Sequence, residues 1–164
     1  MAELADLLRS HVAYTAWASL RLLQAATELS EEELTHDFHT SDRSILGTLA
    51  HIFAADRTWL GRLESAPPIE FIRDSDRRLD VLQNDWPALL DRWKAWAAGV
   101  SGDTASATFT YADLRGRQWA QPLYEVVVHV VNHGTHHRGQ VSGFLRSLGH
   151  TPPRIDYAVF CRER

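Results

Sequence analysis

The helical spacing of apolar residues in four long stretches is the feature that most constrains the fold of this chain. In each stretch, apolar side chains recur every three or four residues, which is the period of one face of an α-helix. This spacing predicts helices over residues 3–29, 44–63, 75–98 and 122–148. Each helix would have an apolar face that packing against other helices must bury. We therefore expect an all-α four-helix bundle, with one domain over residues 1–164.

The segments outside these helices carry different patterns. Residues 36–43 are polar and are predicted to form a loop. Residues 101–121 are rich in threonine and aromatic side chains around a turn at residues 114–116, which is typical of a small hairpin or an irregular connection. A connection of this length permits a crossover between helices three and four. Pro87 predicts a kink or a restart of the third helix, and residues 155–160 are expected to pack against the bundle in extended form.

Charge and cysteine content argue against several classes of protein. The formal net charge is −4 and the basic residues are scattered among acids, whereas a nucleic-acid-binding surface normally shows a clustered basic patch. The single cysteine, Cys161, makes a disulfide within the chain impossible. No stretch approaches the ~20 apolar residues of a membrane span, and the N-terminal residues lack the apolar segment of a signal peptide. We therefore expect a cytoplasmic protein without nucleic-acid or membrane partners.

Histidine is the unusual residue, with nine in the chain. Four of them fall in the fourth predicted helix: His129, His133, His136 and His137. Side chains four residues apart on a helix are ~5–6 Å apart at the Cβ, so two imidazoles can reach one metal ion with bonds of ~2.0–2.1 Å. His129/His133 and His133/His137 both have this spacing. His133 and His137 lie at or within the apolar stripe and are predicted to point inward as ligands, whereas His129 and His136 lie further toward the polar side.

A third ligand has to come from another helix. His51 lies off the main apolar stripe of the second predicted helix, among small residues that include Gly47, Ala54 and Ala55. Small neighbours leave room for a facing helix, as at metal sites inside helix bundles. His11 on the first helix is the competing third ligand, although a lone histidine in an apolar stripe is more often a hydrogen-bonded core residue. Burying imidazoles without partners costs on the order of a few kcal/mol each, and a shared cation would remove that cost.

Several motifs resemble those of the DinB-like (damage-inducible) family. They are Leu49-Ala50-His51-Ile52 with Trp59, His133-Gly134-Thr135-His136-His137-Arg138-Gly139-Gln140, and Leu148-Gly149 followed by Pro152, Pro153 and Asp156. The likeness covers almost the whole chain, from Tyr14 and Trp17 to the tail. It implies a four-helix bundle with an unusual crossover order, often a homodimer, and a three-histidine site for one divalent metal. Carried over by position, the ligands are His51, His133 and His137, where the sequence shows no departure from the family pattern.

The resemblance also implies a class of activity. Characterised relatives include S-transferases and isomerases that use low-molecular-weight thiols such as bacillithiol or mycothiol, and many other members have no established activity. We therefore expect a metal-dependent thiol S-transferase, or related thiol-cofactor chemistry, acting on a small-molecule substrate. The alternatives are a non-enzymatic metal-binding stress-response module and a hydrolase that activates water on the metal. Nickel or zinc is the first expectation for the ion, with iron or manganese as alternatives, because imidazole suits several metals.

The general base of such a reaction is left open by the sequence. The candidates are His129, His136, Glu125 and Tyr14, and His11 is a further candidate for the pocket. Three imidazole ligands would leave a coordination position for water, thiol or substrate. The reacting thiol would belong to the cofactor, so that Cys161 need not act.

Overall fold

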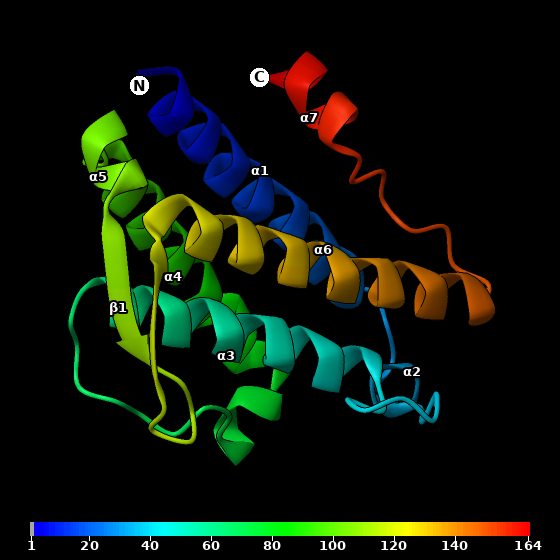
Figure 1. The fold of residues 1–164 in the computed structure, drawn as a ribbon. Coiled ribbons are helices and arrows are strands. Elements are labelled where there is room, and N and C mark those ends of the chain that lie inside the picture. Colours follow the sequence, from blue (N-terminus) through cyan, green and yellow to red (C-terminus); the bar gives the residue numbers. More distant parts are fainter. Residues whose placement is uncertain (1) are drawn as a thin grey trace.

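The computed structural model describes residues 2–164, and most of them lie in helices (Figure 1). The helices are α1 (Ala2–Ala26), α2 (Glu31–Thr35), α3 (Ile45–Leu63), α4 (Leu79–Ala98), α5 (Gly102–Ser106), α6 (Leu123–Ser147) and α7 (Tyr157–Glu163), with a 3₁₀ turn, η1, at Asp74–Arg77. Strands β1 (Thr108–Ala112) and β2 (Gln118–Pro122) form an antiparallel hairpin in the segment where the sequence predicts one. The expectation of a predominantly helical protein is confirmed. None of the helices in residues 2–164 has the length and apolar character to cross a membrane.

The four longest helices correspond to the four stretches of helical spacing. α1 packs against α4 and α6, and α3 packs against the same two helices (Figure 1). α4 runs through Pro87 as a single helix, so the restart considered at this residue does not occur. Side chains from all four helices meet in the core and are almost completely buried, among them Leu22, Leu49, Trp86 and Val127. Packing of α3 against α6 brings two histidine-bearing segments together that are far apart in the sequence.

Capping residues explain where several helices begin and end. The Ser44 side chain accepts a hydrogen bond from the backbone N–H of Gly47 at 3.0 Å and so starts α3. Ser30 and Glu33 form a reciprocal capping box at the start of α2. After α6, Gly149 adopts the left-handed conformation with φ of 88°, which glycine tolerates better than other residues. These local signals are visible in the sequence.

The third predicted helix is too long at its start. The sequence pattern places its beginning at Ser75, whereas α4 begins at Leu79, after the extended residue Arg78. Asp76 lies in η1 and is buried, and its carboxylate accepts hydrogen bonds from both terminal nitrogens of Arg57 at 2.8 and 2.7 Å. This ion pair ties the segment to α3, and local spacing cannot predict a contact of this kind.

The prediction of an extended tail is wrong. Residues 155–160 lie partly in α7, a short helix near the C-terminus (Figure 1) that packs against α1. Tyr157 and Phe160 are three residues apart, so a helix presents both rings to the same neighbour. Their ring centroids lie 5.2 and 5.9 Å from that of Tyr14 in α1. The helical tail is therefore held by aromatic packing on α1.

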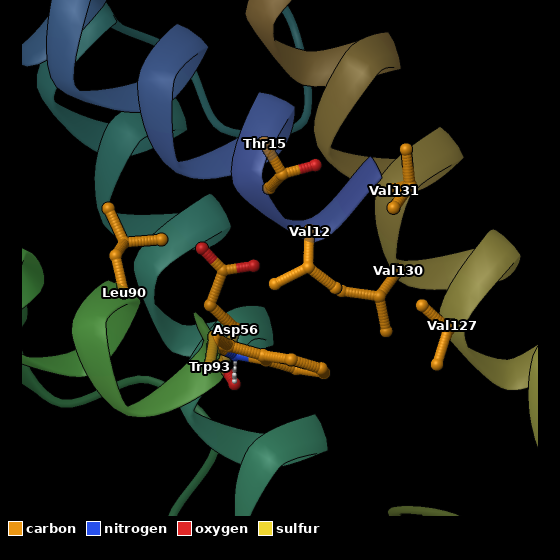
Figure 2. Close-up of a pocket in the computed structure, with 8 residues that line it drawn as sticks. All are labelled: Val12, Thr15, Asp56, Leu90, Trp93, Val127, Val130 and Val131. Atoms are coloured by element: carbon orange, nitrogen blue, oxygen red, sulfur yellow. Dashed lines mark hydrogen bonds between the residues drawn. The ribbon is translucent and has the colours of Figure 1, made fainter. Parts of the chain in front are cut away.

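A buried carboxylate, Asp56, lies where α3 meets α4. Its side chain accepts a hydrogen bond from Trp86 Nε1 and its backbone oxygen accepts one from Trp93 Nε1, both at 3.0 Å. Figure 2 shows the carboxylate directed toward Thr15 of α1, beside an apolar cavity of about 10 Å³, which is about the smallest that can hold one water molecule. The hydroxyl of Thr15 is buried without a hydrogen-bond partner among residues 2–164.

Burial makes Asp56 a source of pH-dependent stability. Desolvation raises its pKa to about 6, against the opposing effects of the Trp86 hydrogen bond and the Arg138 charge. Between pH 4 and 6 the unfolded chain therefore loses this proton before the folded protein does. As pH rises from 4 to 6, the free energy of unfolding should therefore fall, by roughly 2–3 kcal/mol for a shift of this size.

Asp56→Asn is expected to remove this fall. Asparagine keeps an acceptor for Trp86 but cannot ionise, so the difference in stability between variant and wild type should grow in favour of the variant from pH 4 to pH 6. Urea denaturation of both proteins at several pH values measures this difference. The exposed Asp85→Asn in α4 controls for the loss of one carboxylate. Parallel curves for wild type and Asp56→Asn would contradict the assignment.

Candidate metal centre

Three histidine rings converge where α3 packs against α6. His51 comes from α3, and His133 and His137 come from successive turns of α6. One ring nitrogen from each lies within 4.8 Å of the others. The Nε2 atom of His133 is 3.0 Å from Nε2 of His51 and 3.2 Å from Nε2 of His137. His137 is buried, whereas the other two are partly exposed, so the cluster is accessible from one side.

The spacing of these nitrogens fits a shared metal ion. Two ligands on a tetrahedral ion with metal–nitrogen bonds of ~2.0–2.1 Å lie about 3.3 Å apart. The two short Nε2 separations are close to that value. Hydrogen bonds among the rings explain the short distances less well than a shared ion does. Nε2 of His133 can carry only one proton and so can donate to His51 or to His137, but not to both. The donor set of three imidazoles therefore suits a divalent ion such as zinc or nickel.

Oxygen atoms behind the rings orient two of them. His51 Nδ1 lies 3.2 Å from Asp42 Oδ1, and His137 Nδ1 lies 2.7 Å from Gln140 Oε1. These oxygens favour a proton on Nδ1, through a hydrogen bond from His137 to Gln140 and through the nearby charge of Asp42 for His51, so that each ring presents a lone pair at Nε2. Lone pairs facing one another across about 3 Å repel unless a cation lies between them. Carboxylate and amide partners of this kind commonly orient metal-binding histidines.

Burial disfavours the protonated form of two of the three rings. Burial first, and the charges of the neighbouring histidines second, lower the pKa of His133 to about 3. Burial also lowers the pKa of His51, although the Asp42 carboxylate acts in the opposite direction. At neutral pH both rings are thus in the unprotonated form that binds metals.

Asp42 and Gln140 are site residues that sequence reasoning misses. Gln140 follows His137 by three residues, so helical spacing alone could have indicated their contact. Asp42 lies in the predicted loop, where spacing says nothing about neighbours. Its position depends on Gly47, because a Cβ atom at residue 47 would lie only 2.1 Å from the Asp42 backbone oxygen. The glycine lets the loop lie against the first turn of α3, one turn before His51.

His129 and His136 flank the cluster without joining it. The His129 ring centroid is 6.0 Å from that of His133 and packs edge-on against Trp59 at 5.2 Å. Burial lowers the pKa of His129, and the charge of Arg62 adds to this effect. His136 is exposed, with its ring centroid 4.9 Å from that of His137.

The structure places the remaining candidates away from the three histidines. His11 packs against Tyr157, and its Nδ1 atom is buried with no hydrogen-bond partner in the described part of the chain. Tyr14 donates a hydrogen bond from its hydroxyl to the Ile155 backbone oxygen at 2.9 Å. Glu125 is exposed in the first turn of α6.

Arg138 lies beside His137 in the sequence but faces the core. Its side chain is completely buried, donates to Thr135 Oγ1 at 3.0 Å and lies over the ring of Tyr14 at 5.4 Å. Gly134 leaves room for it, since a Cβ atom there would lie 2.7 Å from Arg138 Nη1. These residues of the histidine motif therefore join α6 to α1 and do not contact the ligand nitrogens.

A solvent-open cleft leads to the cluster. His51 and His133 line one part of it, and α3, α6 and the β-hairpin form its walls. Its volume is about 470 Å³, within the range of roughly 300–1,000 Å³ typical of small-molecule sites. Trp59, Phe71 and Tyr111 give it aromatic surface. A small molecule could reach the histidines from this side.

Asp42→Asn is expected to weaken zinc binding by about tenfold. The amide keeps an oxygen near His51 Nδ1 but removes the negative charge that supports the ligand, and losing such a partner commonly costs 10–100-fold in metal affinity. Competition with a chromophoric chelator measures the affinity. Asp37→Asn is a matched control in the same loop, because Asp37 pairs with Arg43 and not with the three histidines. Equal losses in the two variants would contradict a specific role for Asp42.

Comparison with known proteins gives two similarities. A model of the DinB family matches residues 1–163, which include all three histidines and the cleft. The chain is also similar to Protein DinB of Bacillus subtilis (strain 168), with 21% identity over 155 residues. That alignment covers 90% of this chain and 89% of the relative.

Proposed function

Since the chain belongs to the DinB family, we propose that it is a metal-dependent enzyme that transfers a small thiol to an electrophilic small molecule. The convergence of three Nε2 atoms at 3.0 and 3.2 Å beside an open cleft is the observation that carries this proposal. His51, His133 and His137 are the proposed ligands. Nickel or zinc is the proposed ion, with iron or manganese as alternatives.

The bound ion would supply Lewis acidity, which lowers the pKa of a thiol and favours its nucleophilic thiolate form. Asp42 and Gln140 hold the rings of His51 and His137 with their Nε2 lone pairs directed to the common point. His129, at the edge of the cleft, is the proposed acceptor of the thiol proton. The sulfur then forms a bond to the electrophilic carbon of the second substrate, whose leaving group departs with the bonding electron pair.

The openness of the site favours catalysis over a structural or storage role. Structural zinc sites usually have four protein ligands, whereas the cluster found within residues 2–164 has three. The cleft gives a small molecule access to the same point. A non-enzymatic metal-binding module and a hydrolase remain the alternative outcomes of the test.

Cobalt substitution tests the proposal directly. The cobalt-loaded protein is titrated with thiols of increasing size, and a new near-ultraviolet sulfur-to-cobalt band is expected. The zinc- or nickel-loaded protein is then assayed for displacement of chloride from monochlorobimane by a thiol and for hydrolysis of p-nitrophenyl acetate in the absence of thiol. Hydrolysis without a thiol response would favour the hydrolase, and no response in any assay would favour the binding module. His136→Ala, outside the cluster, is the control for surface histidine effects.

The finer architecture is also a proposal. The pairing of α1 and of α3 with both α4 and α6 supports a four-helix bundle. The segment with α5 and the β-hairpin would provide the crossover between α4 and α6. Homodimerisation and a cytoplasmic location stay predictions.

A further inference from the structure

The cleft beside the histidines carries an excess of positive charge. Arg62 from α3 and Arg115 and Arg117 from the β1–β2 turn line it, against a single acidic residue, Asp113. The whole chain has a formal net charge of −4. The cleft is thus locally positive although the protein as a whole is negative, which favours an anionic ligand there.

Arg62 is held in place by aromatic rings. Its guanidinium carbon lies 4.4 Å from the centroid of Trp59 and 5.5 Å from that of Tyr111. Burial lowers the pKa of Arg62, while Tyr111 and Asp113 oppose this effect. Within residues 2–164, no carboxylate forms an ion pair with Arg62, Arg115 or Arg117, whereas six other arginines each pair with one. These guanidinium groups therefore remain available to a ligand.

The Asp113 carboxylate accepts hydrogen bonds from its own turn and from Trp119. Its carboxylate accepts the backbone N–H groups of Arg115 and Arg117, each at 2.9 Å, and Trp119 Nε1 at 3.0 Å. These hydrogen bonds fix the backbone that carries both arginines. Asp113 offsets part of the positive charge, but an excess of positive charge remains. Its hydrogen bonds also hold the backbone of Arg115 and Arg117 in a fixed conformation.

We infer that the cleft binds an elongated organic anion, whose anionic group is held by Arg62 and the hairpin arginines while its reacting end faces the three histidines. This inference rests on the proposed function for the identity of the reacting end. Trp59, over which the Arg62 guanidinium lies, packs against His129 at 5.2 Å, and the His129 ring centroid is 6.0 Å from that of His133. A molecule that contacts both the guanidinium and the three histidines has to extend past these intervening rings, which favours an elongated ligand over a short one. The planar guanidinium fork suits a carboxylate, and the aromatic walls suit an apolar body.

Matched pairs of thiols test this inference. The zinc-loaded protein is titrated calorimetrically with 8-mercaptooctanoate and 8-mercaptooctanol, and then with 3-mercaptopropionate and 3-mercaptopropanol. The longer acid is expected to bind about tenfold more tightly than its alcohol, as a charge-assisted hydrogen bond provides, and the preference should shrink in the shorter pair. Octanoate and octanol repeat the comparison without sulfur.

Arginine variants identify the residues responsible. Arg62→Gln is expected to remove the preference for the longer acid and for octanoate while leaving the alcohols within about twofold of wild type. Arg117→Gln, in an exposed turn, should reduce the same preference in part and provides a second test should Arg62→Gln fold poorly. Arg21→Gln is the control, because Arg21 also lies over a tryptophan, Trp17, but outside this cleft.

The outcomes separate this inference from the proposed function. If thiols perturb the cobalt spectrum but acids and alcohols bind equally, the anion site is wrong and the thiol chemistry stands. If thiols leave the cobalt spectrum unchanged while octanoate binds in an Arg62-dependent way, the anion site stands and the thiol chemistry is wrong. Loss of the acid preference in Arg21→Gln to the same extent as in Arg62→Gln would also overturn the inference.

Discussion

Replacing His133 with alanine is expected to lower the zinc affinity of the protein by about a thousandfold. Its Nε2 atom makes both of the short contacts in the cluster, to His51 and to His137. The variant would keep only two ligands, one on each helix. Because structural zinc sites with about four ligands bind with roughly 10–16 kcal/mol, one ligand accounts for about 2.5–4 kcal/mol, and the upper end of this range corresponds to about a thousandfold. Chelator competition and metal analysis after dialysis measure the loss.

His136→Ala is the matched control for this experiment. His136 lies on the same helix and next to His137, but it is exposed and its ring nitrogens are not part of the cluster. Its replacement should leave zinc affinity within about threefold of wild type, since it removes no ligand. Equal retention of zinc by both variants would refute the three-histidine site and, with it, the proposed chemistry.

The metal-free His133→Ala protein should also differ in its response to acid. Burial holds the pKa of His133 at about 3 in the folded protein, below the ordinary value of 6.5. As pH falls below 6.5, the unfolded chain therefore takes up a proton that the folded protein does not, so wild-type stability declines toward pH 3. The variant lacks this group and should lose less stability over the same window, as urea denaturation would measure.

Local periodicity explains why much of this molecule could be predicted from its sequence. Helix spacing locates the four long helices, and the step from His133 to His137 places two rings on one face of α6. The small residues around His51 indicate that another helix approaches there, as α6 does. Each of these inferences needs only residues within a few turns of one helix.

What the sequence could not predict depends on contacts between distant segments. Asp42 reaches His51 only because a loop packs on α3, and Arg115 and Arg117 reach the cleft only because the hairpin lies beside α3 and α6. The tail is helical because its rings pack on Tyr14. Neither periodicity nor composition carries information about these pairings.

Gly47→Ala is expected to damage both the fold and the metal site. A Cβ atom at this position would lie 2.1 Å from the Asp42 backbone oxygen and 3.3 Å from Ser44 Oγ, so the loop has to move. Overpacking of this kind typically costs 1–3 kcal/mol, and the better helix propensity of alanine returns up to about 1 kcal/mol. We expect a net loss of about 2 kcal/mol in the free energy of unfolding, measured by urea denaturation of the metal-free protein.

The same displacement should weaken zinc binding by about tenfold, because Asp42 would leave His51 Nδ1. Gly139→Ala is the control: its Cβ would meet no atom within 4 Å, so it should stabilise α6 by up to about 1 kcal/mol and leave zinc affinity unchanged. Combining Gly47→Ala with Asp42→Asn separates the two roles of the glycine. If Gly47 acts on the metal only by positioning Asp42, the double variant should bind zinc no more weakly than Asp42→Asn alone, yet it should still show the full loss of stability. Additive losses of zinc affinity would mean that the loop supports His51 through some other contact.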